Sequence, residues 1–230
     1  MPNAAGKAPR VGVLSLQGDF ALHRAALVAL GCEPVRVSLP EHVHALDALI
    51  LPGGESSTML RLLDHTHLRA PIEEFVRTRP VLGTCAGLVL LATAADRLPR
   101  PTFGVIDIDV VRNGYGRQVH SFSDEVDVPA AGGEVSGVFI RAPRITRIGS
   151  GVEVIARRAL HEKGPGEVVG VRKGVAVAIE FHPELTGDLR LHRWFLGEVA
   201  GLPVRDRAHA DDPVLDDSLR DQLRSAGGTR

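Results

Sequence analysis

A cysteine between two glycines carries the strongest chemical signal in the sequence. The segment Gly83-Thr84-Cys85-Ala86-Gly87 follows the apolar residues 81–82 and leads into the apolar residues 88–91. This is the glycine–x–nucleophile–x–glycine pattern of a sharp strand-to-helix turn, with cysteine at the nucleophile position. A helix N-terminus favours the thiolate form of such a cysteine, and its backbone N–H groups can face a developing oxyanion. The pattern predicts that Cys85 is a nucleophile. The plain alternative is a buried cysteine that only packs, which is how we interpret Cys32.

A thiol nucleophile needs a nearby base, and one of the ten histidines lies at the end of a predicted strand. His182 follows the apolar residues 175–179, in Glu180-Phe181-His182-Pro183-Glu184. Side chains alternate along an extended chain, so His182 and Glu184 project to the same side. The carboxylate can then fix the orientation of the imidazole while the other ring nitrogen faces a thiol. Such a segment alone is more often just a turn, but together with Cys85 it predicts a Cys–His–Glu triad.

Two adjacent glycines follow another predicted strand, in Gly53-Gly54-Glu55-Ser56-Ser57. Adjacent glycines permit peptide orientations that other residues resist. A flipped peptide here could turn an N–H group toward a tetrahedral intermediate. The alternative is an ordinary strand-to-helix turn with a serine N-cap. A phosphate-binding loop is not supported, because the G-x-x-x-x-G-K-[ST] pattern is absent.

Arginines end two further predicted strands. The segment Arg112-Asn113-Gly114-Tyr115-Gly116-Arg117 places two guanidinium groups on a glycine-rich loop, and Arg141 follows Ile140. A guanidinium binds a carboxylate through two parallel hydrogen bonds, so these residues are candidates for holding an α-carboxylate. For any one of them, a solvated arginine at a strand end is the simpler interpretation.

The elements that must position these residues alternate between strand and helix in the first half of the chain. Four segments predict strands, at residues 11–16, 33–37, 48–51 and 81–84. The first is a short apolar run of the kind that a doubly covered parallel strand shows. Four segments predict helices, at residues 20–30, 56–63, 70–77 and 86–94. This alternation indicates a parallel sheet covered on both faces.

The second half has a different character, with strands and no long helix until its end. The predicted strands are residues 105–112, 124–128, 134–140, 152–157, 167–172 and 175–179. The last two are joined by Lys173-Gly174, a two-residue hairpin signal. Residues 189–199 predict a closing helix. We therefore expect an α/β fold: one domain whose single mixed, mostly parallel sheet carries helices on both faces.

Length and composition agree with one soluble domain. The chain has 230 residues, 44% of them apolar and 24% charged, with a net charge of −1. It lacks the basic field that nucleic acid or an anionic membrane would need, and it has no apolar run long enough to span a bilayer. With only two cysteines, a disulfide framework is excluded and the cytoplasm is the simplest compartment. The expected domain is residues 10–203, with a flexible N-terminal extension (1–9) and a disordered C-terminal tail (204–230).

Several segments together resemble one known family. They are Val11-Gly-Val-Leu-Ser-Leu-Gln-Gly18, Leu51-Pro-Gly-Gly-Glu-Ser-Ser-Thr-Met59, Gly83-Thr-Cys-Ala-Gly87, Arg112-Asn-Gly-Tyr-Gly-Arg-Gln118, Gly137-Val-Phe-Ile-Arg-Ala-Pro143 and Phe181-His-Pro-Glu-Leu-Thr186. In this order, over about residues 10–200, they resemble the glutaminase subunits of pyridoxal 5′-phosphate synthase. That family belongs to the class I, triad-type glutamine amidotransferases, so the resemblance implies their flavodoxin-like three-layer fold.

The resemblance implies hydrolysis of L-glutamine to glutamate and ammonia. Cys85 would form a γ-glutamyl thioester, His182 would move the protons, and Glu184 would orient His182. The positions that match substrate-binding residues of the family are Gly54, Glu55, Ser56, Arg112, Ile140 and Arg141. The oxyanion hole would use the Gly53–Gly54 peptide and the N–H of Ala86. No metal and no cofactor is implied.

The family also implies a partner. Ammonia would pass to a (β/α)₈-barrel synthase subunit, which makes pyridoxal 5′-phosphate, and Gln17 matches a family glutamine near the subunit contact. Two alternatives remain open. One is a triad amidotransferase that serves histidine, purine or aminobenzoate synthesis. The other is a non-catalytic α/β module in which Cys85 is packed or redox-sensitive.

Overall fold

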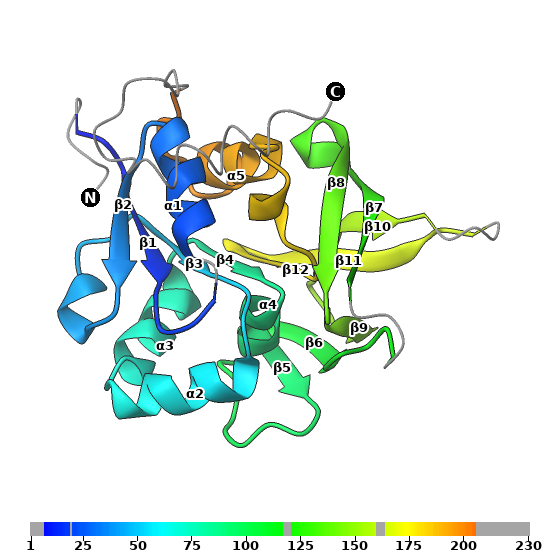
Figure 1. Cartoon of the computed structure of the whole chain (residues 1–230), viewed down its shortest axis with the longest axis horizontal. Helices are drawn as coiled ribbons and strands as arrows, with labels where there is room; N and C mark the ends of the chain where they lie inside the picture. The colour runs from blue at the N-terminus through cyan, green and yellow to red at the C-terminus, as the bar shows by residue number, and fades with distance from the viewer. Residues whose placement is uncertain (1–6, 19, 117–120, 160–163, 206–230) are drawn as a thin grey trace.

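The structure is a computed structural model that describes residues 7–18, 20–116, 121–159 and 164–205 (Figure 1). In chain order the elements are β1 (Arg10–Leu14), α1 (Phe20–Ala29), β2 (Glu33–Val37), η1 (Pro40–His42), β3 (Ala48–Leu51), α2 (Ser56–His65), α3 (Arg69–Thr78), β4 (Val81–Thr84), α4 (Ala86–Leu91), β5 (Ala92–Ala95), β6 (Ile106–Val111), β7 (Ser121–Val128), η2 (Pro129–Ala131), β8 (Gly133–Ile140), β9 (Arg144–Ile148), β10 (Glu153–Arg158), β11 (Glu167–Lys173), β12 (Ala176–Ile179), η3 (Pro183–Leu185), α5 (Arg190–Trp194) and the π-helical turn η4 (Phe195–Val199).

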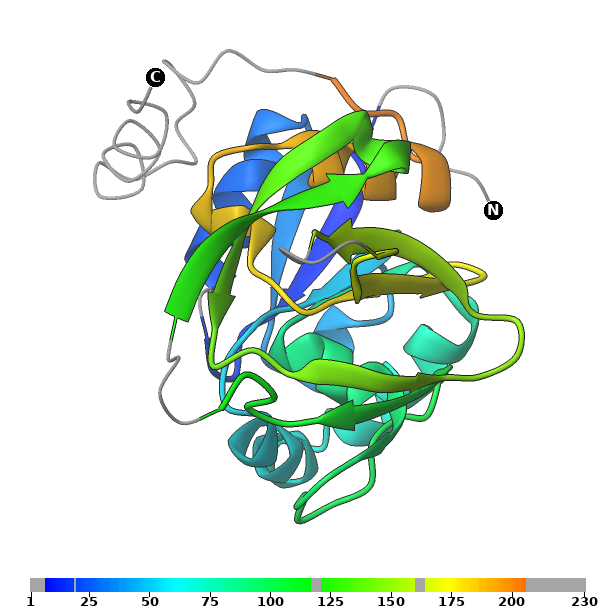
Figure 2. The same cartoon turned by 90° about the vertical axis from the view of Figure 1, so that its right-hand side faces the viewer.

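The described residues form one large sheet with the strand order β2-β1-β3-β4-β12-β11-β10-β7-β8. The pairings from β2 to β12 are parallel, and those from β12 to β8 are antiparallel. The mixed sheet is as expected, but it is divided evenly and is not mostly parallel. The reason is that β7, β8, β10 and β11 join one edge through hairpins, without crossover helices. Figure 2 shows these antiparallel strands on the side that faces the viewer.

The alternation of side chains along the buried strands separates two apolar layers. In β3, Leu49 and Leu51 belong to one cluster, whereas Ala48 and Ile50 belong to the other. The first cluster includes the apolar faces of α2, α3 and α4, and the second includes those of α1, α5 and η4. In Figure 1 these two groups of helices lie on opposite sides of the sheet. The predicted three-layer arrangement is therefore confirmed.

A separate three-stranded sheet, β5-β6-β9, corrects the expectation of one continuous sheet. Residues 92–94 continue the predicted helix in the sequence, but they pair in parallel with β6 instead. Strand β9 was not predicted, because its short segment Arg-Ile-Thr-Arg-Ile has no alternation of apolar and polar residues and begins directly after Pro143. The small sheet packs through Ile106, Ile108 and Val110 into the same apolar layer as α2 to α4.

Packing reaches slightly beyond both ends of the expected domain. Pro9 is buried, and its carbonyl accepts a hydrogen bond of 2.8 Å from the N–H of Glu33. The N–H of Arg205 donates to the carbonyl of Leu30 at 3.1 Å. Residues 1–6 and 206–230, which make up most of the two predicted tails, lie outside the described residues. Within the described part, no helix has both the length and the hydropathy that crossing a bilayer requires.

Candidate active site

Cys85 lies at the sharp turn between β4 and α4, where its pattern predicts it. Its backbone has φ 49° and ψ −102°. Residues other than glycine rarely adopt such a positive φ. Its N–H donates to the carbonyl of Ile179 at 2.9 Å, and its own carbonyl begins α4 by accepting from Val89. The strain is therefore on the cysteine itself. Its glycine neighbour Gly87 is required for a different reason, since a Cβ there would overlap the carbonyl oxygen of Leu51.

His182 reaches Cys85 from the end of β12, which pairs directly with β4. The Cys85 thiol hydrogen-bonds with the imidazole and lies 3.8 Å from the carbonyl oxygen of Ile140. On the other side of the ring, Nδ1 is 2.8 Å from Glu184 Oε1. All three side chains are largely buried, with residue exposures of 6% for Cys85, 8% for His182 and 6% for Glu184. Parallel pairing of two strands distant in sequence thus brings the predicted triad residues together.

The electrostatics favour a charged His182. Burial alone would lower its pKa, but the contacts with Cys85 and Glu184 outweigh that effect and raise the pKa to about 10. Burial likewise opposes ionisation of Glu184, yet the nearby histidines His23 and His182 lower its pKa to about 2. At neutral pH the site therefore holds an imidazolium between the sulfur of Cys85 and the carboxylate of Glu184.

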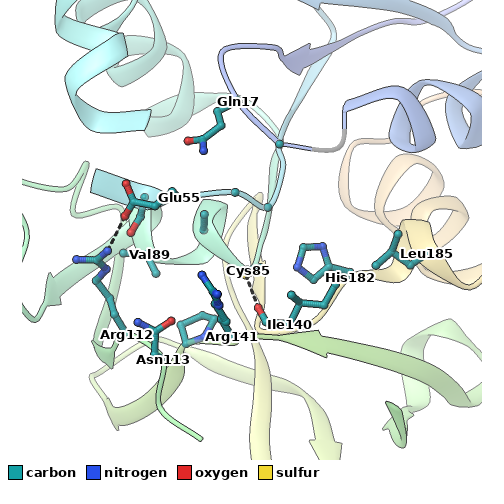
Figure 3. Close-up of a pocket in the computed structure, with 16 residues that line it drawn as sticks. Gln17, Glu55, Cys85, Val89, Arg112, Asn113, Ile140, Arg141, His182 and Leu185 are labelled. Carbon is teal, nitrogen blue, oxygen red and sulfur yellow. Dashed lines mark hydrogen bonds and ion pairs between the residues drawn. The ribbon is translucent and has the colours of Figure 1, made fainter. Parts of the chain in front are cut away.

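A pocket of about 480 Å³ opens above these residues, in the size range of small-molecule sites (Figure 3). Figure 3 shows Cys85, His182 and Ile140 close together at its floor, with Arg112 and Glu55 on another wall. The lining residues are Gln17, Gly18, Gly53, Gly54, Glu55, Ser56, Cys85, Ala86, Val89, Arg112, Asn113, Ile140, Arg141, Pro143, His182 and Leu185.

The Gly53–Gly54 loop crosses directly over the imidazole. A Cβ at Gly53 would overlap Cε1 of His182, so only glycine fits there while the ring keeps its place. Gly54 has φ 148°, a conformation open to glycine and strained for other residues. The loop after β1 packs on this segment, because Gly18 lies against the Gly53 carbonyl.

Three charged side chains, those of Glu55, Arg112 and Arg141, define the rim. Glu55 accepts hydrogen bonds from the N–H groups of Ser57 at 3.1 Å and Thr58 at 2.7 Å, so it caps α2 in place of the expected serine. Partial burial opposes ionisation of Glu55, but its bonds to Thr58 and Ser57 prevail and lower its pKa to about 2. Arg112 Nη2 lies 2.7 Å from Glu55 Oε1. Arg141 has φ 45° and lines the pocket as an exposed side chain.

All but one of the predicted site residues line this pocket. The exception is Glu184, which lies behind His182. Arg117, the second predicted guanidinium of the 112–117 loop, lies outside the described residues. Val89 and Leu185 line the pocket but carried no chemical signal in the sequence, because apolar residues after a nucleophile or a histidine look like ordinary core. Among the described residues, no group of three or more His, Cys, Asp or Glu is arranged to hold a metal ion.

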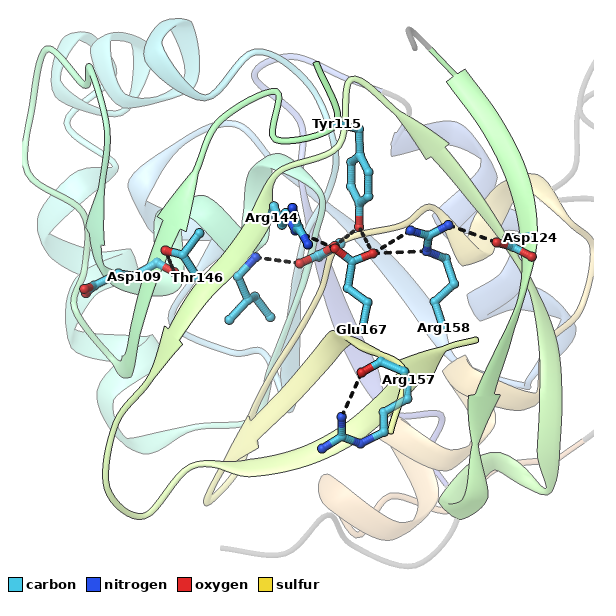
Figure 4. A network of polar contacts seen from close by, with 11 residues as sticks. Asp109, Tyr115, Asp124, Arg144, Thr146, Arg157, Arg158 and Glu167 are labelled. Atoms are coloured by element: carbon cyan, nitrogen blue, oxygen red, sulfur yellow. Dashed lines mark hydrogen bonds and ion pairs between the residues drawn. The ribbon is translucent and has the colours of Figure 1, made fainter. Parts of the chain in front are cut away.

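A polar network supports the wall that carries Arg112 and Arg141 (Figure 4). The Tyr115 hydroxyl lies 2.6 Å from Glu180 Oε2 and 3.1 Å from Glu167 Oε2. Glu167 in turn pairs with Arg144 and Arg158 at 2.5 and 2.6 Å. Burial, opposed by the hydrogen bond with Tyr115, raises the pKa of Glu180 to about 8. This network was not predicted, because its members are spread from residue 115 to residue 180.

Comparison with known proteins gives consistent similarities. A family model described as the SNO glutamine amidotransferase family matches residues 13–201. The chain is 47% identical over 189 residues to the pyridoxal 5′-phosphate synthase subunit PdxT of Thermotoga neapolitana, covering 81% of this chain and 97% of that protein. The subunit of the same name from Pelotomaculum thermopropionicum is 48% identical over 189 residues, covering 81% and 93%. A crystal structure of a glutamine amidotransferase is 45% identical with a TM-score of 0.76, covering 84% of this chain and 99% of that one.

Proposed function

The chain belongs to the SNO glutamine amidotransferase family, and from this premise we propose that it is the glutaminase subunit of a pyridoxal 5′-phosphate synthase. In this role it hydrolyses the side-chain amide of L-glutamine to give L-glutamate and ammonia. The observation that carries the proposal is the buried line of Cys85, His182 and Glu184 at the floor of a pocket.

Cys85 is the nucleophile in the proposed reaction. The proton of its thiol resides on His182, so the sulfur can attack the δ-carbonyl carbon of glutamine, and the C–N bond breaks as the tetrahedral intermediate collapses. His182, charged at neutral pH, gives its proton to the nitrogen that leaves as ammonia. This leaves a γ-glutamyl thioester on Cys85 and a neutral imidazole. His182 then takes a proton from water, whose oxygen attacks the thioester, and glutamate leaves as Cys85 is regenerated.

Glu184 orients His182 throughout, because its Oε1 holds the imidazole Nδ1 at 2.8 Å. That bond keeps Nε2 directed toward the thiol. The oxyanion of each tetrahedral intermediate needs N–H donors. Ala86, the first residue of α4, supplies one, and the Gly53–Gly54 peptide supplies the other after it turns its N–H into the pocket.

The rim residues hold the amino-acid end of glutamine. The Arg141 guanidinium suits the α-carboxylate, and the ionised Glu55 suits the α-ammonium group. Arg112 keeps Glu55 in place through their 2.7 Å ion pair, while Gly54, Ser56 and Ile140 shape the space between.

Ammonia is useful only if it reaches an acceptor before it is lost to solvent. We propose that it passes to a (β/α)₈-barrel synthase subunit that contacts this chain near Gln17, which lines the pocket. A chain with only two cysteines suits a reducing compartment, so we place the complex in the cytoplasm.

The test is ammonia release from glutamine, measured with the purified chain alone and after a synthase barrel subunit is added. We expect release that depends on the partner and disappears in Cys85→Ala. Activity on glutamine that passes ammonia to a different acceptor enzyme would support another amidotransferase pathway. No Cys85-dependent release even with the partner present would favour a non-catalytic module and overturn the proposal.

A further inference from the structure

Two buried histidines continue the line of polar groups behind Glu184. His23, on α1, places Nε2 at 3.3 Å from Glu184 Oε2, the oxygen that does not face His182. Its other nitrogen, Nδ1, lies 3.0 Å from Nε2 of His192, on α5. His23 is 0% exposed and His192 is 1% exposed. The line therefore runs from the pocket floor, through the triad, to the layer between α1 and α5.

The ring protons of the two histidines can be assigned by starting from His192, the residue of this line that lies farthest from the pocket. Burial lowers the pKa of His192 to about 3, so His192 is neutral and carries one ring proton. Among the described residues, its Nδ1 is buried and has no hydrogen-bond partner. A buried N–H without an acceptor is rarer and more costly than a bare acceptor, which places the proton on Nε2.

That assignment fixes His23 as well. If His192 donates from Nε2, then Nδ1 of His23 accepts, and the proton of His23 is on Nε2. Nε2 of His23 is 3.5 Å from the Thr84 hydroxyl oxygen in a hydrogen bond and 3.3 Å from Glu184 Oε2 in a polar contact that lacks hydrogen-bond geometry. Glu184 thus has a histidine near each oxygen: His182 hydrogen-bonds with Oε1, and His23 lies beside Oε2.

We propose that His23 is a positioning residue for the triad: its Nε2, 3.3 Å from Glu184 Oε2, favours the carboxylate rotamer that holds His182 against Cys85. The inference rests on the proposed glutaminase function. Rotation of the Glu184 carboxylate about its terminal bond would release the His182 ring. His192 fixes the tautomer of His23 and acts one step further from the reaction.

The charged and titratable groups facing this line come from several elements. Glu184 belongs to η3, His182 precedes it, Cys85 caps α4, and Asp188 acts electrostatically on His192. Substitution of His23 therefore changes the polar contact beside Glu184 Oε2 without removing any group that touches the substrate.

The experiment compares three variants at His23 with the full chain and its synthase partner present. A glutamine side chain places its amide N–H where Nε2 of histidine lies, so His23→Gln keeps the donor beside Glu184. An asparagine places its amide where Nδ1 lies, so His23→Asn loses that donor but stays polar. His23→Leu fills the same space without a donor.

We expect kcat to fall by about 10- to 100-fold in His23→Asn and His23→Leu, with little change in KM, and we expect His23→Gln to recover most of the lost kcat.

Thermal unfolding of each variant accompanies the kinetics, and His65→Leu, at an exposed histidine on α2, is the matched control. Turnover of glutamine by the wild-type protein is measured first. If the wild type shows no turnover, the proposed glutaminase function is rejected, and the role of His23 is a separate question. With the wild type active, near-wild-type kcat in His23→Leu would overturn the positioning role. So would equal losses in His23→Gln and His23→Asn. If His23→Leu fails to fold, the comparison of kcat between His23→Gln and His23→Asn tests the positioning role. If His23→Gln also fails to fold, His23 has a structural role and the proposal is overturned.

Discussion

At the scale of single residues, the nucleophile carries backbone strain. Cys85 holds φ 49° and ψ −102°, whereas its neighbours in β4 and α4 keep ordinary strand and helix conformations. Strain of this kind costs about 1–3 kcal/mol per residue and persists only where the surrounding structure enforces it. Here the enforcing contacts are the bond from Cys85 N–H to Ile179 and the close packing of Gly87 on Leu51. The strain directs the sulfur out of the sheet toward His182.

This strain predicts a difference between two inactive variants. Cys85→Ala and Cys85→Gly both remove the thiol, but only glycine adopts positive φ without penalty. We expect the free energy of unfolding of Cys85→Gly to be about 1 kcal/mol higher than that of Cys85→Ala. Neither variant should release ammonia, because both lack the thiol. Urea unfolding of both proteins measures the difference. A more stable alanine variant would mean that the turn is not strained as described.

The close approach of Gly53 to His182 gives a second prediction. A methyl group at residue 53 would occupy the space of Cε1, and the ring must then move away from Cys85 or lose its bond to Glu184. A displacement near 1 Å costs about 10²-fold in rate, so we expect Gly53→Ala to lose turnover by about that factor.

Its matched control is Gly164→Ala, because a Cβ at Gly164 meets no atom within 4 Å. Ammonia release and thermal unfolding are measured for both variants. Equal activity of Gly53→Ala and Gly164→Ala would show that the imidazole has more room than the structure gives it.

At the scale of elements, the wall behind Arg112 and Arg141 depends on a protonated carboxyl. Glu180, at the end of β12, shares a hydrogen bond with Tyr115 from the loop after β6, and its Oε1 accepts from the N–H of Ile145 on β9. The pKa of Glu180 is raised to about 8 because burial disfavours its charged form. One neutral acid thus ties the large sheet to the small one.

The pH dependence follows from the sign of this shift. A folded pKa of about 8, above the usual 4.5, means that the folded state binds this proton more tightly than the unfolded state. The stabilisation from Glu180 is fully present below pH 4.5 and is lost as the pH rises to about 8. Glu180→Gln mimics the neutral acid and keeps both hydrogen bonds. We therefore expect unfolding free energy to fall less steeply between pH 5 and about 8 in Glu180→Gln than in the wild type.

Chemical denaturation at several pH values measures this difference, and Glu125→Gln, at an exposed residue of β7, is the control. Parallel stability curves for the wild type and Glu180→Gln would contradict the raised pKa.

The same elements show what the sequence could predict. Strands β2, β3 and β4 have the expected bounds. For the fully buried β3 and β4 the reason is that short apolar runs between turn residues have few alternatives in a doubly covered sheet. The closeness of Cys85 and His182 could be expected because both follow strands of the parallel part of the sheet. Strand β5 and the Glu180 network could not, since alanines favour helix locally and the network depends on pairings between segments distant in sequence.

At the scale of the whole molecule, the loop after β1 links the pocket to the segment that carries Gly53 and Gly54. Gln17, on this loop, lines the pocket, and its Oε1 is buried without a hydrogen-bond partner among the described residues. The next residue, Gly18, has φ 96° and packs against the Gly53 carbonyl. A subunit that presses on Gln17 therefore acts on the peptide that we propose completes the oxyanion hole.

The proposed subunit contact near Gln17 predicts how the Gln17→Ala variant behaves. The variant keeps the triad, so alkylation of Cys85 by iodoacetamide in the isolated chain should proceed at the wild-type rate. The rise in ammonia release on adding the synthase barrel subunit should be smaller, because the partner loses its hold on the loop that moves Gly53–Gly54. Titration of the partner separates weaker binding, which saturating partner overcomes, from weaker coupling, which persists at saturation. Full stimulation at every partner concentration would place the subunit contact elsewhere and leave the buried Gln17 oxygen as a local feature of the loop.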